Sequence, residues 1–190
     1  MTGSQSENES SDLGAASDSD VRFEESDDTV TFVETTSNDI DLDGDGIPDG
    51  RRTVTTETRE TDLDGDGVAD VIETITFEET ALDVDGDGII DVVTIVETDE
   101  VQMDLDGDGE ADSVEVTEVR TVGFDVSGDG VIDVTRTDVV SASAIDPDAA
   151  GTFQDVEASG VRIFGIDSDG DGTIDDVQAE ELDIEIVDED

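Results

Sequence analysis

The chain has 190 residues, of which 58 are acidic and 7 are basic, giving a formal net charge of −51. This charge argues against nucleic acid and anionic membranes as partners, since both repel an acidic protein, and it favours cations. The sequence contains no histidine, cysteine or lysine, so it lacks the side chains that most often act as catalytic bases and nucleophiles, and we expect no enzyme. No apolar run approaches the roughly 18 residues that span a bilayer, so no membrane insertion is expected.

Residues 1–19 are rich in serine, aspartate and glutamate, a composition typical of disordered segments. We therefore predict a disordered acidic leader over 1–19 and a single repeat array over 20–190. The first stretch rich in β-branched residues runs from Thr29 to Thr35. It is predicted to open the array as an exposed edge strand that can pair with a neighbouring chain.

A six-residue motif, D-x-D-G-D-G or D-x-S-G-D-G, recurs along the rest of the chain. Its copies begin at Asp41, Asp62, Asp83, Asp104, Asp125 and Asp167. The first five starts share a 21-residue period, and the sixth follows after two periods. A fixed period of this length indicates a repeat protein. At the skipped register, Asp146 begins a degenerate copy whose closing acid, Asp155, comes one residue late. We expect that turn to hold no ion.

Each intact copy extends to a nine-residue loop, D-x-D-G-D-G-x-x-D, whose side chains at positions 1, 3 and 5 converge and whose ninth residue closes the shell. The glycine at position 6 permits the left-handed turn around an ion. A flexible, oxygen-only ligand set suits Ca²⁺ better than Mg²⁺, and the lack of histidine and cysteine disfavours zinc and copper. The predicted side-chain ligands of about six calcium sites are Asp41, Asp43, Asp45 and Asp49; Asp62, Asp64, Asp66 and Asp70; Asp83, Asp85, Asp87 and Asp91; Asp104, Asp106, Asp108 and Asp112; Asp125, Ser127, Asp129 and Asp133; and Asp167, Asp169, Asp171 and Asp175.

Three details complete the predicted sites. Ser127 replaces a carboxylate, so its loop is expected to bind more weakly. Position 7 is expected to supply a backbone carbonyl, from Ile47, Val68, Ile89, Glu110, Val131 and Thr173. Asp188 and Asp190 begin a further copy at the end of the sequence, which is interpreted either as a repeat truncated from a longer array or as an intersubunit half-site that a neighbouring chain completes.

The loops resemble the calcium loops of EF-hands, of thrombospondin type 3 repeats, and of FG-GAP and VCBS repeats. The longer loop of an EF-hand ends in glutamate at its twelfth position and is flanked by helices, whereas only Glu73 and Glu115 occupy that position here. The cysteines of thrombospondin type 3 repeats are missing. The nine-residue form followed by a strand is closer to FG-GAP and VCBS loops, which connect β-strands. The resemblance covers the loops, and it implies calcium as the bound ion.

The 12-residue stretches between loops are rich in valine, isoleucine, threonine and glutamate, so they are predicted to be strands and the fold to be all-β. Two elongated arrays fit the period. In an antiparallel β-meander the calcium loops connect strands at alternate edges, and Arg59 faces Glu73, Arg120 faces Asp138 and Arg162 faces Glu180. In a parallel β-solenoid the loops form one calcium ladder, and Arg52 meets Glu73. The bulk of each loop favours the meander, because solenoid loops would stack only ~4.8 Å apart.

Apolar residues recur just before most loops, where they are interpreted either as a thin core near the metal sites or, preferably, as ordinary packing at the strand ends: Ile40, Leu82, Met103, Phe124, Ile145, Ile166 and Val187. For the whole chain we predict an extracellular or cell-surface structural protein that folds with Ca²⁺ and forms homo-oligomers or filaments through its terminal repeats. The alternatives are a soluble calcium buffer or sensor, or an acidic surface protein of a salt-loving organism.

Overall fold

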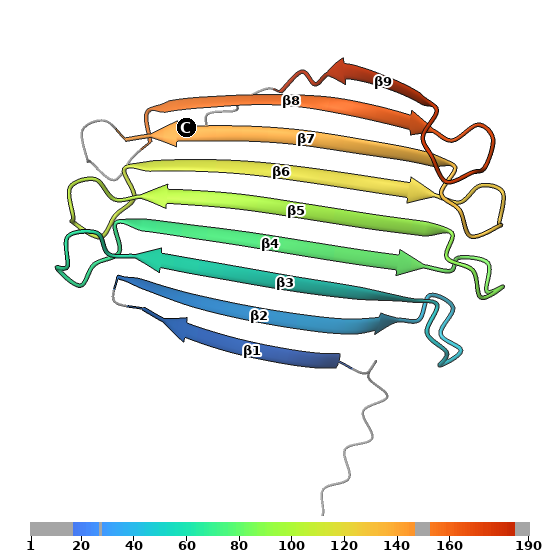
Figure 1. The fold of residues 1–190 in the computed structure, drawn as a ribbon, viewed down its shortest axis with the longest axis horizontal. Helices are drawn as coiled ribbons and strands as arrows, with labels where there is room; N and C mark the ends of the chain where they lie inside the picture. The colour runs from blue at the N-terminus through green and yellow to red at the C-terminus, as the bar shows by residue number, and fades with distance from the viewer. Residues whose placement is uncertain (1–16, 27, 147–152, 185–190) are drawn as a thin grey trace, which may run out of the picture.

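The computed structural model describes residues 17–26, 28–146 and 153–184, which form a single all-β sheet. The strands lie side by side in chain order, and each pairs antiparallel with the next (Figure 1). The antiparallel meander is therefore confirmed, and the parallel solenoid is wrong. The nine strands are β1 (Ser17–Glu25), β2 (Thr29–Ile40), β3 (Gly50–Thr61), β4 (Val71–Leu82), β5 (Val92–Met103), β6 (Ser113–Phe124), β7 (Val134–Ile145), β8 (Asp155–Ile166) and β9 (Asp176–Glu181).

The strand register follows directly from the period. Strands β2 to β8 have 12 residues each, as the spacing of the loops predicts, and each strand end pairs with the start of the next. Ile40 faces Gly50 across one loop, and Thr61 faces Val71 across the following loop. Because strands and intact loops both keep a constant length along the array, every intact loop meets the sheet in the same geometry.

The opening strand differs from the prediction. The stretch that begins at Thr29 is β2, an interior strand, and the edge is formed by β1. β1 begins at Ser17, inside the segment predicted to be a disordered leader, whereas residues 1–16 lie outside the described residues. This strand was not predicted because most of its residues are charged or polar. Its charged residues alternate with Val21 and Phe23, the two-residue period that is typical of a strand, and β1 pairs with β2.

The sheet has only one layer and almost no core. Among the described residues, Val122 is the one buried hydrophobic side chain, with 8% of its surface exposed. The predicted thin core next to the loops is wrong for the residues that can be assessed, because no second layer covers them: Met103, Phe124, Ile145 and Ile166 are 36–48% exposed. Ile40 and Leu82 are half-buried, and Val187 lies outside the described residues.

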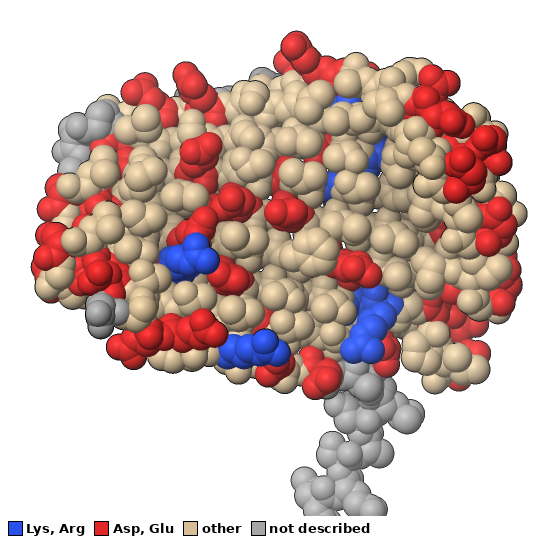
Figure 2. Space-filling model, viewed as in Figure 1, with Lys and Arg blue, Asp and Glu red and all other residues tan. Residues whose placement is uncertain are grey.

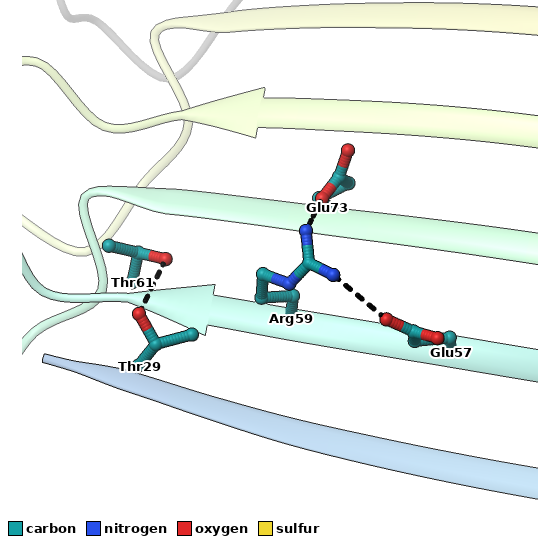
Figure 3. A network of polar contacts seen from close by, with 5 residues as sticks. All are labelled: Thr29, Glu57, Arg59, Thr61 and Glu73. Atoms are coloured by element: carbon teal, nitrogen blue, oxygen red, sulfur yellow. Dashed lines mark hydrogen bonds and ion pairs between the residues drawn. The ribbon is translucent and has the colours of Figure 1, made fainter. Parts of the chain in front are cut away.

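Polar contacts across the strands take the place of apolar packing. Hydroxyl groups pair between neighbouring strands, as in Thr35 with Thr55 at 3.0 Å and Thr121 with Thr137 at 2.9 Å. Figure 3 shows such a pair beside Arg59, whose guanidinium lies between Glu57 and Glu73. Facing pairs of this kind contribute roughly 0.2–1 kcal/mol each, so the sheet depends on many small contributions.

The facing charge pairs expected for a meander are present. Arg59 faces Glu73, Arg120 faces Asp138 and Arg162 faces Glu180. Asp138 forms its close ion pair with Arg162, on its other side, at 2.5 Å. The guanidinium of Arg162 holds the pKa of this carboxyl below its usual value. The stacking of Arg52 on Glu73 that a solenoid would need is wrong, because Arg52 bonds Glu78.

Candidate metal-binding loops

The six intact loops lie in two rows, one at each end of the strands. The even row follows β2, β4, β6 and β8, and consists of loops 41–49, 83–91, 125–133 and 167–175. The odd row follows β3 and β5, and consists of loops 62–70 and 104–112. Figure 1 shows the two rows at opposite sides of the sheet, and Figure 2 shows acidic side chains gathered over both. The prediction that sites alternate between two edges is therefore confirmed for the loops themselves.

Both glycines of each loop adopt left-handed backbone conformations. In loop 62–70, φ is 81° at Gly65 and 94° at Gly67, and the corresponding values in the other five loops lie between 72° and 89°. A side chain at such a φ is strained, which explains the second glycine as well as the one at position 6. A turning role was predicted only for position 6, although both glycines recur in every intact copy and so indicate a turn at both positions.

The first aspartate organises each loop from inside. In loop 62–70, the carboxylate of Asp62 accepts hydrogen bonds from the amides of Gly65 at 2.7 Å and Gly67 at 2.9 Å. These donors lower the pKa of Asp62 below its ordinary value. Backbone amides also lower the pKa of Asp41 and Asp104. At Asp125 and Asp167, burial raises the pKa, but the amide donors outweigh it and the pKa is lowered. In these five loops the first aspartate is thus held in its charged form.

The remaining carboxylates are oriented in the same way. In loop 62–70, Asp64 accepts from the amide of Asp66 at 3.0 Å, and Asp66 accepts from the amide of Val68 at 2.8 Å. The closing Asp70 accepts from the amide of Leu63 near the start of the loop. A carboxylate oxygen has lone pairs to spare after one such bond. Hydrogen bonds from backbone amides therefore orient each aspartate side chain of this loop and leave oxygen lone pairs available for a cation.

Five loops bring three carboxylates into one cluster, with one oxygen of each within 4.8 Å of the others. In the even row the clusters contain positions 1, 3 and 9, and in the odd row positions 1, 3 and 5. The clusters are Asp41, Asp43 and Asp49; Asp83, Asp85 and Asp91; Asp167, Asp169 and Asp175; Asp62, Asp64 and Asp66; and Asp104, Asp106 and Asp108. Oxygen-only donor sets of this kind fit a hard cation such as Ca²⁺.

Some predicted ligands lie in the loops but outside these clusters. They are position 5 of the even row and position 9 of the odd row, namely Asp45, Asp87, Asp171, Asp70 and Asp112. The loop of Asp125, Ser127, Asp129 and Asp133 forms no cluster of three acids, and the hydroxyl of Ser127 instead donates to Asp125 at 3.3 Å. That outcome agrees with the weaker binding expected there. Ligation by the position 7 carbonyls stays a prediction.

Burial and repulsion between neighbouring carboxylates affect the pKa of one aspartate in these clusters. Asp106 lies at position 3 of its loop, and burial together with the negative charge of Asp108 raises its pKa. Three carboxylates that each place one oxygen within 4.8 Å of the others repel one another. A bound cation would convert that repulsion into attraction.

Consecutive loops of one row are joined through their backbones. In the even row the amide of Asp83 donates to the carbonyl of Asp49 at 2.7 Å, and the amide of Asp125 donates to the carbonyl of Asp91 at 2.9 Å. The odd row repeats this, with the amide of Asp104 donating to Asp70 at 2.9 Å. The backbone carbonyl at position 9 of one loop thus accepts a hydrogen bond from the amide at position 1 of the loop two repeats later. These links were not predicted from the sequence, although the strict 21-residue period places equivalent loop positions at regular intervals along each row.

The degenerate copy and the half-site lie mostly outside the described residues. Asp146 is 4% exposed, and its amide donates to the carbonyl of Asp112 at 2.7 Å, so it keeps its place in the odd row. Gln154 stands where the other loops have their ninth aspartate, and its amide closes the turn on Ile145 at 2.9 Å. Residues 147–152, and Asp188 and Asp190, are not described. Whether these two places hold an ion stays a prediction.

Comparison of the chain with known protein families, curated proteins and solved structures finds no match. Within the described ranges, no helix is long and apolar enough to cross a membrane. The geometry of the loops, and no relative, is therefore what supports metal binding by this single-layered antiparallel sheet.

Proposed function

We propose that this chain is a structural protein of the cell exterior whose sheet is held together by Ca²⁺ bound in about six aspartate loops. The observation that carries the proposal is the convergence of three carboxylates at five of the turns, in a sheet whose described part has a single buried hydrophobic residue. Six bound ions would change the formal charge from −51 to −39.

The lack of a core makes the loops the main candidates for stabilising the fold. A domain of this size normally buries much apolar surface, at about 25 cal/mol per Å². In the described part of the chain no second layer of strands or helices covers the sheet, so that contribution is small, while ordering each residue still costs about 1–2 kcal/mol of backbone entropy. A cation bound at a turn ties together the end of one strand and the start of the next. Binding and folding are then one event, and the binding free energy becomes folding free energy.

Calcium is the proposed ion because of the ligands and their setting. The loops offer carboxylates from a flexible turn and no nitrogen or sulfur, which suits the six to eight oxygen ligands of Ca²⁺ better than the strict octahedron of Mg²⁺. Loops in extracellular modules bind calcium at roughly 10⁻⁴–10⁻³ M, a concentration that is maintained outside cells. An array that needs filled loops to stay folded would therefore work there.

The test is a titration of the metal-stripped protein followed by far-ultraviolet circular dichroism. We expect β-structure to appear cooperatively near millimolar Ca²⁺, and not with equal Mg²⁺. Potassium chloride at about 1 M, which shortens the Debye length to about 3 Å, serves as the second control. Folding in potassium chloride alone would favour the acidic surface protein of a salt-loving organism. A circular dichroism spectrum of β-structure that is present without metal and unchanged by added metal would contradict the proposal, because the loops would then be acidic turns that need no ion.

A further inference from the structure

β1 leaves one long side of the sheet open. Among the described residues it is the outermost strand and pairs with β2 alone, as Figure 1 shows at the lower border of the sheet. Two of its apolar side chains are among the most exposed of the described residues, with Val21 at 54% and Phe23 at 61%. An edge of this kind offers backbone amides and carbonyls to any strand that approaches it. Natural edges are commonly protected by proline or by unfavourable charge, and β1 contains no proline.

The charges of β1 are complementary to themselves. The strand Ser17–Glu25 has Val21 at its centre, with Asp20 and Arg22 on either side. If two copies of β1 pair antiparallel about a twofold axis through Val21, then Asp20 of each copy faces Arg22 of the other. These two residues point to the same face, because side chains alternate along a strand. Opposite charges that face each other across strands are stabilising.

The free chain leaves these two side chains available. Arg22 bonds Asp20 of its own strand at 3.1 Å, and their side chains remain 75% and 64% exposed. An exposed pair of this kind contributes little by itself. In the self-paired edge each guanidinium would contact a carboxylate on both strands, while Val21 would face Val21 of the second copy. One unfavourable pair opposes this on each side, since Asp18 would face Glu24.

Other arrangements of the open edges fit less well. Centring the twofold axis on Phe23 also brings Arg22 opposite an acid, Glu24, but it pairs only five residues of the strand instead of nine. The opposite edge, β9, contains Asp176, Glu180 and Glu181 and no basic residue, so self-pairing there would bring only like charges together.

We propose that β1 pairs antiparallel with β1 of a second copy of this chain, about a twofold axis at Val21, and so joins two nine-stranded sheets into one. The pairing uses no residue of the aspartate loops. It therefore goes beyond the proposed role of calcium, and either can fail without the other. A single pair of strands is a small interface, so the dimer is weak and concentration-dependent.

Single cysteines test the register, because the chain has none of its own. Facing residues in an antiparallel pair lie about 4.5–5.5 Å apart, within the span of a disulfide. Under mild oxidation Val21→Cys is expected to give covalent dimers at least ~10-fold faster than Ser19→Cys or Phe23→Cys, whose copies would lie roughly 13 Å apart along the strands. Equal rates at the three positions, or the fastest rate at Phe23, would overturn the proposal.

A charge swap tests the contacts in solution. Sedimentation velocity at about 0.15 M salt, where the Debye length is about 8 Å, is expected to show weaker association for Arg22→Asp. The double variant Asp20→Arg with Arg22→Asp restores the complementary pairs and should restore association. Arg51→Asp, on interior strand β3, changes the net charge equally and should leave association unchanged, with circular dichroism confirming the fold of each variant. A double variant that associates no better than Arg22→Asp contradicts the proposal.

Discussion

The two rows of loops share one consensus, yet the structure gives them different clusters of carboxylates. The even row gathers positions 1, 3 and 9, and the odd row gathers positions 1, 3 and 5. The rows also differ at position 8, which is large in most even-row loops, as at Ile132 and Ile174, and small in the odd row, at Ala69 and Ala111. The same loop motif is therefore found with two different sets of converging carboxylates, one in each row.

The packing at position 8 shows how the rows differ. Ile132 lies over Gly123, where an added Cβ would come within 3.0 Å of its side chain, and Ile174 lies over Gly165 in the same way at 3.1 Å. In the odd row the small alanines leave a hollow between loops, lined by Asp70, Gln102, Asp104 and Ala111 among others. Consecutive loops approach each other in both rows: an added Cβ would lie 3.7 Å from Ile89 at Gly130 of the even row, and 3.9 Å from Asp66 at Gly107 of the odd row.

The largest effect on stability is expected from placing a side chain at Gly123, where Ile132 packs closely on the strand. Gly123→Val should lower the free energy of unfolding in saturating calcium by about 1–3 kcal/mol, because the new side chain overpacks against Ile132. Chemical denaturation followed by circular dichroism measures this. Adding Ile132→Ala should recover most of the loss, since it makes the room that the odd row already has. Gln102→Val, at the equivalent odd-row position, is the matched control and should change stability by less than about 1 kcal/mol. Failure of the rescue would show that the packing difference is not what distinguishes the rows.

A smaller effect is expected on calcium binding by the neighbouring loops of one row, because backbone hydrogen bonds join loops within a row. Asp83→Asn removes the organising carboxylate of loop 83–91 and should reduce the number of bound ions by one. The hydrogen bonds from Asp83 to Asp49 and from Asp125 to Asp91 join this loop to its even-row neighbours. Those neighbours should then bind calcium more weakly, while odd-row loops are unchanged. Nuclear magnetic resonance of the amides of Gly46 and Gly130, with Gly67 and Gly109 as odd-row controls, reports each site during a titration. Equal weakening of all four amide responses would mean that the rows are not separate units.

The smallest effect concerns the one intact loop without a cluster of three acids. Ser127→Asp supplies the missing carboxylate at position 3 and makes loop 125–133 match its even-row neighbours. The affinity of that site should rise, with little change elsewhere, because the other ligands and both glycines are already in place. Calorimetric titration would detect the change as the loss of the weakest binding event. An unchanged isotherm would indicate that the serine hydroxyl, which donates to Asp125 at 3.3 Å, is not what limits the site.

Much of the fold could be predicted because it depends on local spacing. The nine-residue loop and the 12-residue strand specify both the strand bounds and the facing pairs, such as Arg59 with Glu73. The edge strand could not be recognised in this way. Ser17–Glu25 is charged and carries no loop motif, and it becomes a strand through pairing with β2. The burial of the residues before each loop was also mispredicted, since Phe124 and Ile166 have the composition of a core but no second layer to cover them.

The sequence by itself determined the period, the left-handed glycines and the type of side chain in the loops, because each depends on residues close together in the chain. Only the tertiary structure chose the two rows of a meander over the single ladder of a solenoid, and decided which three carboxylates meet in each loop and which amide donates to the preceding loop of the row. These features depend on strands two repeats apart. Asp49 and Asp83 become neighbours only when β3 and β4 lie between them in one sheet, and no short-range pattern encodes that contact.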